Sequence, residues 1–255
     1  MHQFDFLNPQ RDYQDVSNPL YAKNEKFPML DLFSGILGFT MAAERTGRFE
    51  TLLTSEIDPY CKKLIESKFN LENSGSVTTL AQPQSSHDDF ELVEADQVPC
   101  EETGFSSVCL EDFYDGAIEF PFIITGGFPC QEVTSANTNA LGITGGESQL
   151  VDDQLRIIRA LEPQYCIFEN SSLLVGRGLD SILEELMDIG YIVEWETIAA
   201  AAFGYTHYRH RCYVVAYLPT SEAAKRDIKV FDLVRDSVPV TQLFPISRWP
   251  SILQS

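Results

Sequence analysis

The sequence predicts an α/β fold built on a mostly parallel sheet, and three observations lead to that prediction. Short apolar runs typical of buried strands alternate along the chain with stretches whose apolar residues recur at helical spacing. Several strand-like runs end in glycine-rich or polar turns, as strands do when they lead into a helix. The chain has 255 residues, 44% hydrophobic and 22% charged, which allows a sizeable core and excludes global disorder.

The predicted elements follow one another at the spacing of β-α-β units. Residues 28–33 form an apolar run that ends in Ser34-Gly35, and apolar residues at helical spacing continue up to Gly47. Residues 51–55 form a second strand, after which Asp58 and Pro59 are a typical N-cap and first helical residue. The later elements are a strand at 120–125, a helix around 151–158, a strand at 165–168, a helix at 179–186, and strands at 191–202 and 212–217.

The domain organisation is one large domain between two shorter segments. We assign residues 1–27 to a lead segment, 28–218 to the folded domain and 219–255 to a short C-terminal segment. Residues 81–107 are acidic, contain prolines and lack periodicity, which predicts a surface insertion in the domain.

The net charge of −20 is unevenly distributed along the chain. No Lys or Arg occurs between Lys68 and Arg156, whereas residues 69–155 contain sixteen Asp and Glu. This balance argues against a general polyanion binder, although it leaves room for a local basic cleft.

Localisation and metal content follow from three features that the sequence lacks. The sequence has no run of eighteen apolar residues that would predict a membrane span, and its N-terminus does not resemble a secretory signal. The six cysteines form no Cys-x-x-Cys pair and have no His at zinc-ligand spacing. We therefore expect a cytoplasmic protein with free thiols and no metal site. We also expect the protein to be bacterial or phage-encoded.

Four short motifs at predicted strand ends carry chemistry. Gly35 and Gly38 would let the backbone approach a ligand, and Glu56 is placed to accept hydrogen bonds from ribose hydroxyls, although such glycines are often structural. Cys130 follows a glycine-rich turn, which favours a nucleophile over a buried thiol. Glu169 ends another strand, where a carboxyl group can exchange a proton.

The fourth motif combines cations on one segment. His207, Arg209 and Arg211 occupy alternate positions, so an extended segment would present them on one face. The alternative is an ordinary solvated edge strand.

Taken together, these motifs resemble the DNA (cytosine-5)-methyltransferase family. Residues 31–39 resemble its S-adenosylmethionine loop, 56–60 its ribose-binding segment, 126–131 its catalytic loop, 169–170 the start of its Glu-Asn-Val motif and 207–211 its Gln-x-Arg-x-Arg motif. The resemblance implies a Rossmann-like, S-adenosylmethionine-dependent methyltransferase sheet with helices on both faces. It also implies that the sheet is mostly parallel with an antiparallel strand near the end.

The resemblance also implies a reaction and a set of site residues. The reaction is methyl transfer from S-adenosylmethionine to C5 of a flipped cytosine in DNA, through a covalent bond between Cys130 and C6. Glu169 would hold N3 of the base, and Arg209 and Arg211 would supply positive charge. The implied cofactor-binding residues are Phe33, Ser34, Gly35, Leu37, Gly38, Glu56, Ile57 and Pro129.

Two departures from the family pattern keep three interpretations open. The family's Asp near the cofactor adenine is not evident, and the candidate positions read Gly75-Ser76-Val77 or Ser106-Ser107-Val108. The target-recognition region and the closing motif are not found after residue 218. The protein is therefore an active methyltransferase, a catalytic subunit whose DNA recognition lies on a second chain, or a non-catalytic binding or regulatory relative. In every case we expect weak binding to duplex DNA by these 255 residues alone.

Overall fold

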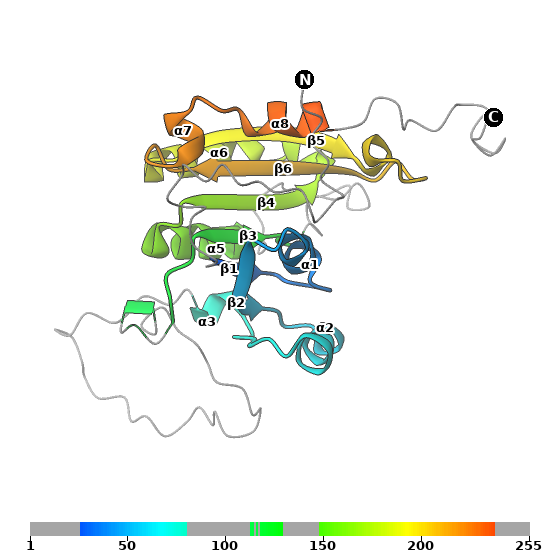
Figure 1. Cartoon of the computed structure of the whole chain (residues 1–255), viewed down its shortest axis with the longest axis vertical. Coiled ribbons are helices and arrows are strands. Elements are labelled where there is room, and N and C mark those ends of the chain that lie inside the picture. Colours follow the sequence, from blue (N-terminus) through cyan, green and yellow to red (C-terminus); the bar gives the residue numbers. More distant parts are fainter. Residues whose placement is uncertain (1–25, 81–112, 115, 117, 130–147, 238–255) are drawn as a thin grey trace.

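The computed structural model describes residues 26–80, 113–114, 116, 118–129 and 148–237, which build a six-stranded sheet in the order β2-β1-β3-β4-β6-β5 (Figure 1). β1 (Phe27–Leu32), β2 (Phe49–Ser55), β3 (Ile123–Gly126) and β4 (Tyr165–Ser171) are parallel. β6 (His210–Tyr217) runs antiparallel to β4 and to the edge strand β5 (Ile192–Ala199). The predicted mostly parallel sheet with an antiparallel strand near the end is confirmed.

Two helix boundaries lie where the local sequence predicts them. Asp58 accepts hydrogen bonds from the backbone N–H groups of Tyr60 and Cys61, both at 3.0 Å, and so caps the helix that starts at Pro59. Gly190, with φ 106°, ends the helix before β5. The α-helices are α1 (Gly38–Arg45), α2 (Pro59–Leu64), α3 (Val77–Leu80), α5 (Ser148–Leu161), α6 (Leu179–Ile189), α7 (Glu222–Lys225) and α8 (Val230–Ser237). Among these described helices, none has the length and apolarity needed to cross a bilayer.

Three shorter helical turns extend this framework. α2 continues as a π-helical turn, η2 (Ile65–Phe69), and two 3₁₀ turns follow β4 and β5, namely η5 (Ser172–Gly176) and η6 (Ala200–Phe203). The strand predicted over 191–202 therefore ends at Ala199. Alanine has low strand preference and high helix preference, which explains why the alanine-rich end of that run turns instead of continuing.

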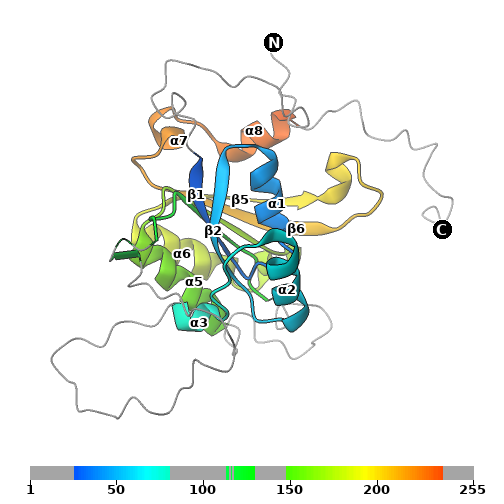
Figure 2. The ribbon, with the colours of Figure 1, turned by 60° about the horizontal axis from the view of Figure 1, so that its bottom comes forward.

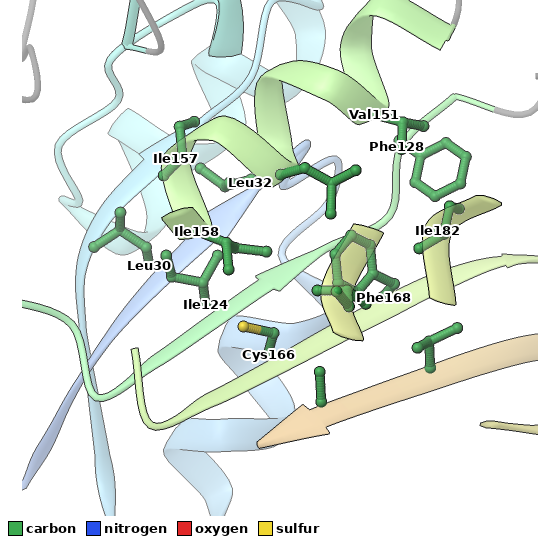
Figure 3. Packing of buried hydrophobic residues seen from close by; sticks show 14 of the residues in the cluster. Leu30, Leu32, Ile124, Phe128, Val151, Ile157, Ile158, Cys166, Phe168 and Ile182 are labelled. Atoms are coloured by element: carbon green, nitrogen blue, oxygen red, sulfur yellow. The ribbon is translucent and has the colours of Figure 1, made fainter. Parts of the chain in front are cut away.

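The main core lies between the sheet and the face covered by α5 and α6. Leu30 and Ile124 from the strands and Ile158 from α5 are fully buried there, and Figure 3 shows these side chains packed with Phe168 of β4. Val151, Leu155 and Ile158 recur at helical spacing on the buried side of α5.

The opposite face of the sheet is covered by different helices. α8 packs there through Phe231 against Val215 and Tyr217 of β6, and α1 contacts the same face near β2. Figure 2 shows α1, α7 and α8 on the side of the sheet away from α5 and α6. The predicted arrangement of helices on both faces is confirmed.

Candidate active site

The motif residues gather at one edge of the sheet. Because β1, β2, β3 and β4 are parallel, their carboxyl ends meet at the same edge, where ligands bind in open α/β sheets. β6 runs in the opposite direction, so its first residues, rather than its last, reach this edge.

The turn that follows β1 has an unusual backbone. Phe33, Gly35 and Leu37 all have positive φ, at 53°, 52° and 67°. A left-handed conformation costs a non-glycine residue about 1–2 kcal/mol, and such residues cluster at functional sites. A Cβ at Gly35 would meet only the Phe33 carbonyl oxygen, at 3.9 Å, so the backbone here stays open to a ligand.

Buried hydrogen bonds hold this turn against the strands. Ser34 donates to the Asp31 carbonyl, and the Ser34 hydroxyl accepts from the backbone N–H of Ser55 at 3.2 Å. Ser34 and Leu37 are buried, so these two residues support the turn from beneath. Ile57, in contrast, is 68% exposed at the same edge.

Asp31 is a buried carboxyl group directly beneath the turn, and the sequence motifs did not single it out. It is 1% exposed and accepts hydrogen bonds from the hydroxyls of Thr40, at 2.7 Å, and Thr125, at 2.8 Å. Burial raises the pKa of Asp31 to about 6, although these hydrogen bonds partly oppose the rise. Asp31 therefore links β1, α1 and β3 at the point where the turn begins. The available signal was an acidic residue inside an otherwise apolar run.

Glu56 connects the turns after β1 and β2. One carboxylate oxygen accepts from the backbone N–H of Gly35 at 2.7 Å, and the other accepts from Ile57 and Asp58, both at 2.8 Å. A carboxylate has about four lone-pair sites, so about one remains for a ligand hydroxyl.

Asn73 fixes the backbone of Glu56 from the neighbouring segment. Its side chain accepts from the Glu56 N–H at 2.9 Å and donates to the Glu56 carbonyl at 3.1 Å. Sequence reasoning missed Asn73 because the contact joins residues 17 apart, on either side of α2 and η2.

The segment after β3 reaches the edge beside Glu169. Asn170, 2% exposed, donates to the Phe128 carbonyl at 3.1 Å and so holds the residues just before Pro129. A Cβ placed on Gly127 would lie 3.1 Å from a Glu169 carboxylate oxygen, so the glycine lets this carboxylate lie close to the chain. Cys130, the predicted nucleophile, lies outside the described residues.

Glu169 is paired with Arg211 across β4 and β6. The Arg211 Nε lies 2.7 Å from a Glu169 carboxylate oxygen, and both side chains are about a quarter exposed, at 24% and 27%. The pair is thus fixed in geometry but open to a ligand.

The prediction that one extended segment includes His207, Arg209 and Arg211 is wrong for His207. β6 begins only at His210, and His207 lies in a bend that follows Gly204. The 3₁₀ turn η6 and Gly204, with φ 86°, turn the chain before the strand starts. Arg211 is half-buried against Glu169, while Arg209 is exposed.

Comparison with known families follows this geometry. The family described as C-5 cytosine-specific DNA methylase matches residues 27–116 and 110–243. The chain belongs to this family. Its matched regions include β1 with its turn, Glu56, Glu169 and Arg211.

Individual relatives in the family share moderate sequence identity with the chain. The Type II methyltransferase M1.ScrFI of Lactococcus lactis is 27% identical over 76% of this chain and 42% of its own length. M.HpaII of Haemophilus parainfluenzae is 29% identical over 80% of this chain and 49% of its own. The chain thus spans about half the length of these relatives.

Solved structures support the fold. The Dnmt2 methyltransferase of S. pombe superposes with a TM-score of 0.57 and 16% identity, over 84% of this chain and 55% of the other. The Entamoeba histolytica methyltransferase EhMeth gives a TM-score of 0.53 and 16% identity, over 76% and 53%. The predicted methyltransferase-like sheet is therefore confirmed.

The cysteines in the described part of this C-5 methylase family member are poor nucleophiles. Cys166 and Cys212 are buried, and burial raises the pKa of both thiols, to about 11 for Cys212. The pKa of Cys61 is also raised, by desolvation and by the nearby Asp58 and Glu56 carboxylates. A thiol with a raised pKa holds little thiolate at neutral pH.

The candidate adenine-side segment lies beside the end of β2. The Gly75 carbonyl accepts from the Ser55 hydroxyl at 2.8 Å, and the Ser76 hydroxyl accepts from the Thr78 N–H at 3.2 Å. Gly75-Ser76-Val77 is therefore next to the Glu56 turn, while the alternative Ser106-Ser107-Val108 lies outside the described residues.

Proposed function

We propose that this chain carries the catalytic half of a DNA (cytosine-5)-methyltransferase, which moves a methyl group from S-adenosylmethionine to C5 of cytosine. Family membership supports the reaction, and the observation that carries it to this chain is the Glu169–Arg211 pair beside the start of the Cys130 segment. The matched relatives are named type II methyltransferases, so we place the role in restriction–modification.

The turn after β1 fits a nucleoside-type cofactor. Gly35 gives an open backbone at positive φ, and the Glu56 carboxylate, held by three N–H groups, keeps about one site for a ribose hydroxyl. Phe33 would offer its ring to the adenine. Ser34, Leu37, Gly38, Ile57 and Pro129 complete the proposed site, in which the buried Ser34 and Leu37 support the turn from beneath.

The chain's own residues divide the chemistry. Cytosine C5 is a weak nucleophile, so we assign Cys130 to attack C6 and convert C5 into an enamine-like carbon. Glu169 would hold N3 while charge builds on the ring, and Arg211 keeps that carboxylate in position through its 2.7 Å contact. Arg209, which is exposed, would neutralise the phosphate beside the base.

The bond changes balance around Cys130. The thiolate forms the S–C6 bond, C5 takes the methyl group that the bound sulfonium of S-adenosylmethionine supplies, and the C5 proton leaves to a base. The electrons of that C–H bond restore the C5–C6 double bond and release the thiolate. The target base must leave the stack to reach Cys130, which implies a flipped nucleotide.

A trapping experiment tests the proposal. The 255-residue chain is incubated with the cofactor and an oligonucleotide that contains 5-fluorocytosine, whose fluorine cannot leave as a proton. We expect a denaturation-resistant protein–DNA adduct from wild type, none from Cys130→Ser, and the wild-type amount from the control Cys61→Ser. A Cys130→Ser variant that still transfers methyl groups to ordinary cytosine within tenfold of wild type would remove Cys130 from the mechanism.

We further propose that recognition of duplex DNA depends on residues outside these 255, on a second chain or a longer one. The relatives are about twice as long, and the net charge of −20 opposes contact with phosphates. A gel-shift titration of the purified chain tests this. Nanomolar, sequence-specific duplex binding at about 0.15 M salt would contradict it, because specific sites are bound at such affinities by complete proteins.

The non-catalytic interpretation predicts a different outcome. If neither methyl transfer nor the 5-fluorocytosine adduct forms, even with a single-stranded substrate that needs no base extrusion, a binding or regulatory role replaces the enzymatic one. Calorimetric titration with the cofactor then decides whether the turn after β1 binds a ligand at all.

A further inference from the structure

The connection between β5 and β6, residues 200–209, exposes an unusual number of aromatic side chains, and we call it the aromatic hairpin. Phe203 is 48% exposed, Tyr205 64% and Tyr208 51%. The rings of Tyr205 and His207 are stacked, with centroids 5.9 Å apart and planes at 29°. Large exposed aromatic rings so close in sequence are typical of a surface that binds a partner.

The aromatic hairpin also carries positive charge in an otherwise acidic chain. Residues 197–221 contain no Asp or Glu but include two Arg and two His, whereas residues 69–155 contain sixteen acids and no Lys or Arg. Within the part of the chain that the structure describes, no carboxylate forms an ion pair with Arg209. Its charge is therefore available to an anionic ligand.

The antiparallel direction of β6 brings the aromatic hairpin to the edge of the sheet where the carboxyl ends of β1, β2, β3 and β4 meet, which we call the working edge. Arg211, which lies only two residues after Arg209, is opposite Ser171 of β4 in the sheet and forms an ion pair with Glu169. Figure 1 shows the β5–β6 connection projecting well past the end of β4, and Figure 2 shows it standing away from the body of the fold. A ligand at Glu169 can therefore extend onto it.

We infer that the aromatic hairpin binds unpaired nucleotides of the DNA strand that flank the base entering the site, an assignment that rests on the proposed function. Every base has a π-face, so stacking on Phe203, Tyr205 or Tyr208 is tolerant of sequence, and a neighbouring cation attracts the phosphates. The net charge of −20 disfavours contact with double-stranded DNA over a large surface, whereas a few nucleotides of a single strand need only the local charge of Arg209 beside the aromatic rings. Protein partners also select aromatic residues and arginine, and the test separates them from a nucleic acid.

The test compares single-stranded and duplex oligonucleotides of the same sequence on the full chain. A fluorescein-labelled single strand is titrated by anisotropy at about 0.1 M salt. We expect Phe203→Ala and Tyr205→Ala each to weaken binding about tenfold, the order reported by alanine substitution of a stacking residue. Tyr205→Phe keeps the ring and should bind as wild type does. Phe120→Ala, an aromatic residue that is 44% exposed at the opposite edge of the sheet, is the matched control and should change nothing.

Several outcomes overturn the inference. The inference is wrong if the wild-type chain does not bind the single strand, or if it binds the duplex as tightly as the single strand. It is also wrong if the Phe203→Ala and Tyr205→Ala variants bind the single strand as tightly as wild type does. Cofactor binding by the same preparations shows that each variant is folded.

Methyl transfer, measured in parallel, reports separately on the proposed function. If wild type transfers methyl groups and the variants bind the single strand as wild type does, only the nucleotide-binding role of the aromatic hairpin is refuted. If wild type does not transfer methyl groups but the variants bind the single strand about tenfold more weakly than wild type, only the enzymatic role is refuted.

Discussion

Asp31 makes the stability of this protein depend on pH in an unusual direction. Burial in the sheet raises its pKa from the ordinary 3.8 to about 6, so the folded protein holds this proton after the unfolded chain has lost it. The stabilising effect of the proton is fully present below the unfolded pKa and is lost as the pH rises through the folded value. Unfolding free energy therefore falls with rising pH.

The size of the effect follows from the shift. One pKa unit corresponds to about 1.4 kcal/mol, so the ionised form of Asp31 costs the folded state about 3 kcal/mol. Linkage places about 1.4 kcal/mol of that loss between pH 5 and 7.5. This window lies above the isoelectric point of 4.4, near which a protein tends to precipitate.

The assay is urea unfolding followed by far-ultraviolet circular dichroism, repeated across that window. Asp31→Asn keeps an oxygen to accept from Thr40 but cannot ionise, so its loss of stability between pH 5 and 7.5 should be smaller than wild type by about 1.4 kcal/mol. Asp188→Asn, which removes an exposed charge on α6, should run parallel to wild type. Parallel curves for wild type and Asp31→Asn would refute the account of Asp31 as a buried titrating group.

Three further predictions concern the working edge. Gly126→Ala places a Cβ 2.4 Å from the amide nitrogen of the fully buried Gln154, so we expect urea unfolding to show a loss of about 1–3 kcal/mol. Gly176→Ala, whose Cβ meets no described atom within 4 Å, should change stability by less than about 0.5 kcal/mol. Glu56→Gln turns an amide NH₂ toward a backbone N–H, so calorimetry should show cofactor affinity about tenfold weaker, and an unchanged affinity would exclude this role. Arg211→Lys keeps the charge but loses the Nε contact to Glu169, so kcat should drop at least about tenfold while cofactor affinity stays the same, and the reverse pattern would contradict the assignment.

Structural features that depend on single residues could be predicted from the sequence. The Asp58 cap and the left-handed Gly190 follow from side-chain and backbone preferences of single residues, so the helix boundaries they set were predictable. The antiparallel strand near the end came from the family resemblance, since nothing in an apolar run of six or eight residues specifies its direction. The strand order was not predicted and comes from the structure alone.

The missed features are contacts between distant residues. Asp31 and Thr125 are 94 positions apart, and their hydrogen bond exists only because β1 and β3 are neighbours in the sheet. The extended segment expected to include His207 failed for a local reason, because η6 and Gly204 bend the chain before β6 begins. A period-two pattern marks a shared face only where the backbone is extended.

The reversed strand β6 has a consequence for how such a protein can be altered. A parallel sixth strand would require a crossover through the helical layer, whereas β5 and β6 are joined by a short loop that leaves the sheet and returns at the same end. Residues 200–208, which precede Arg209, can therefore be lengthened, shortened or exchanged between relatives without rethreading the core. Grafting this loop alone offers a route to new substrate preferences on an unchanged catalytic scaffold.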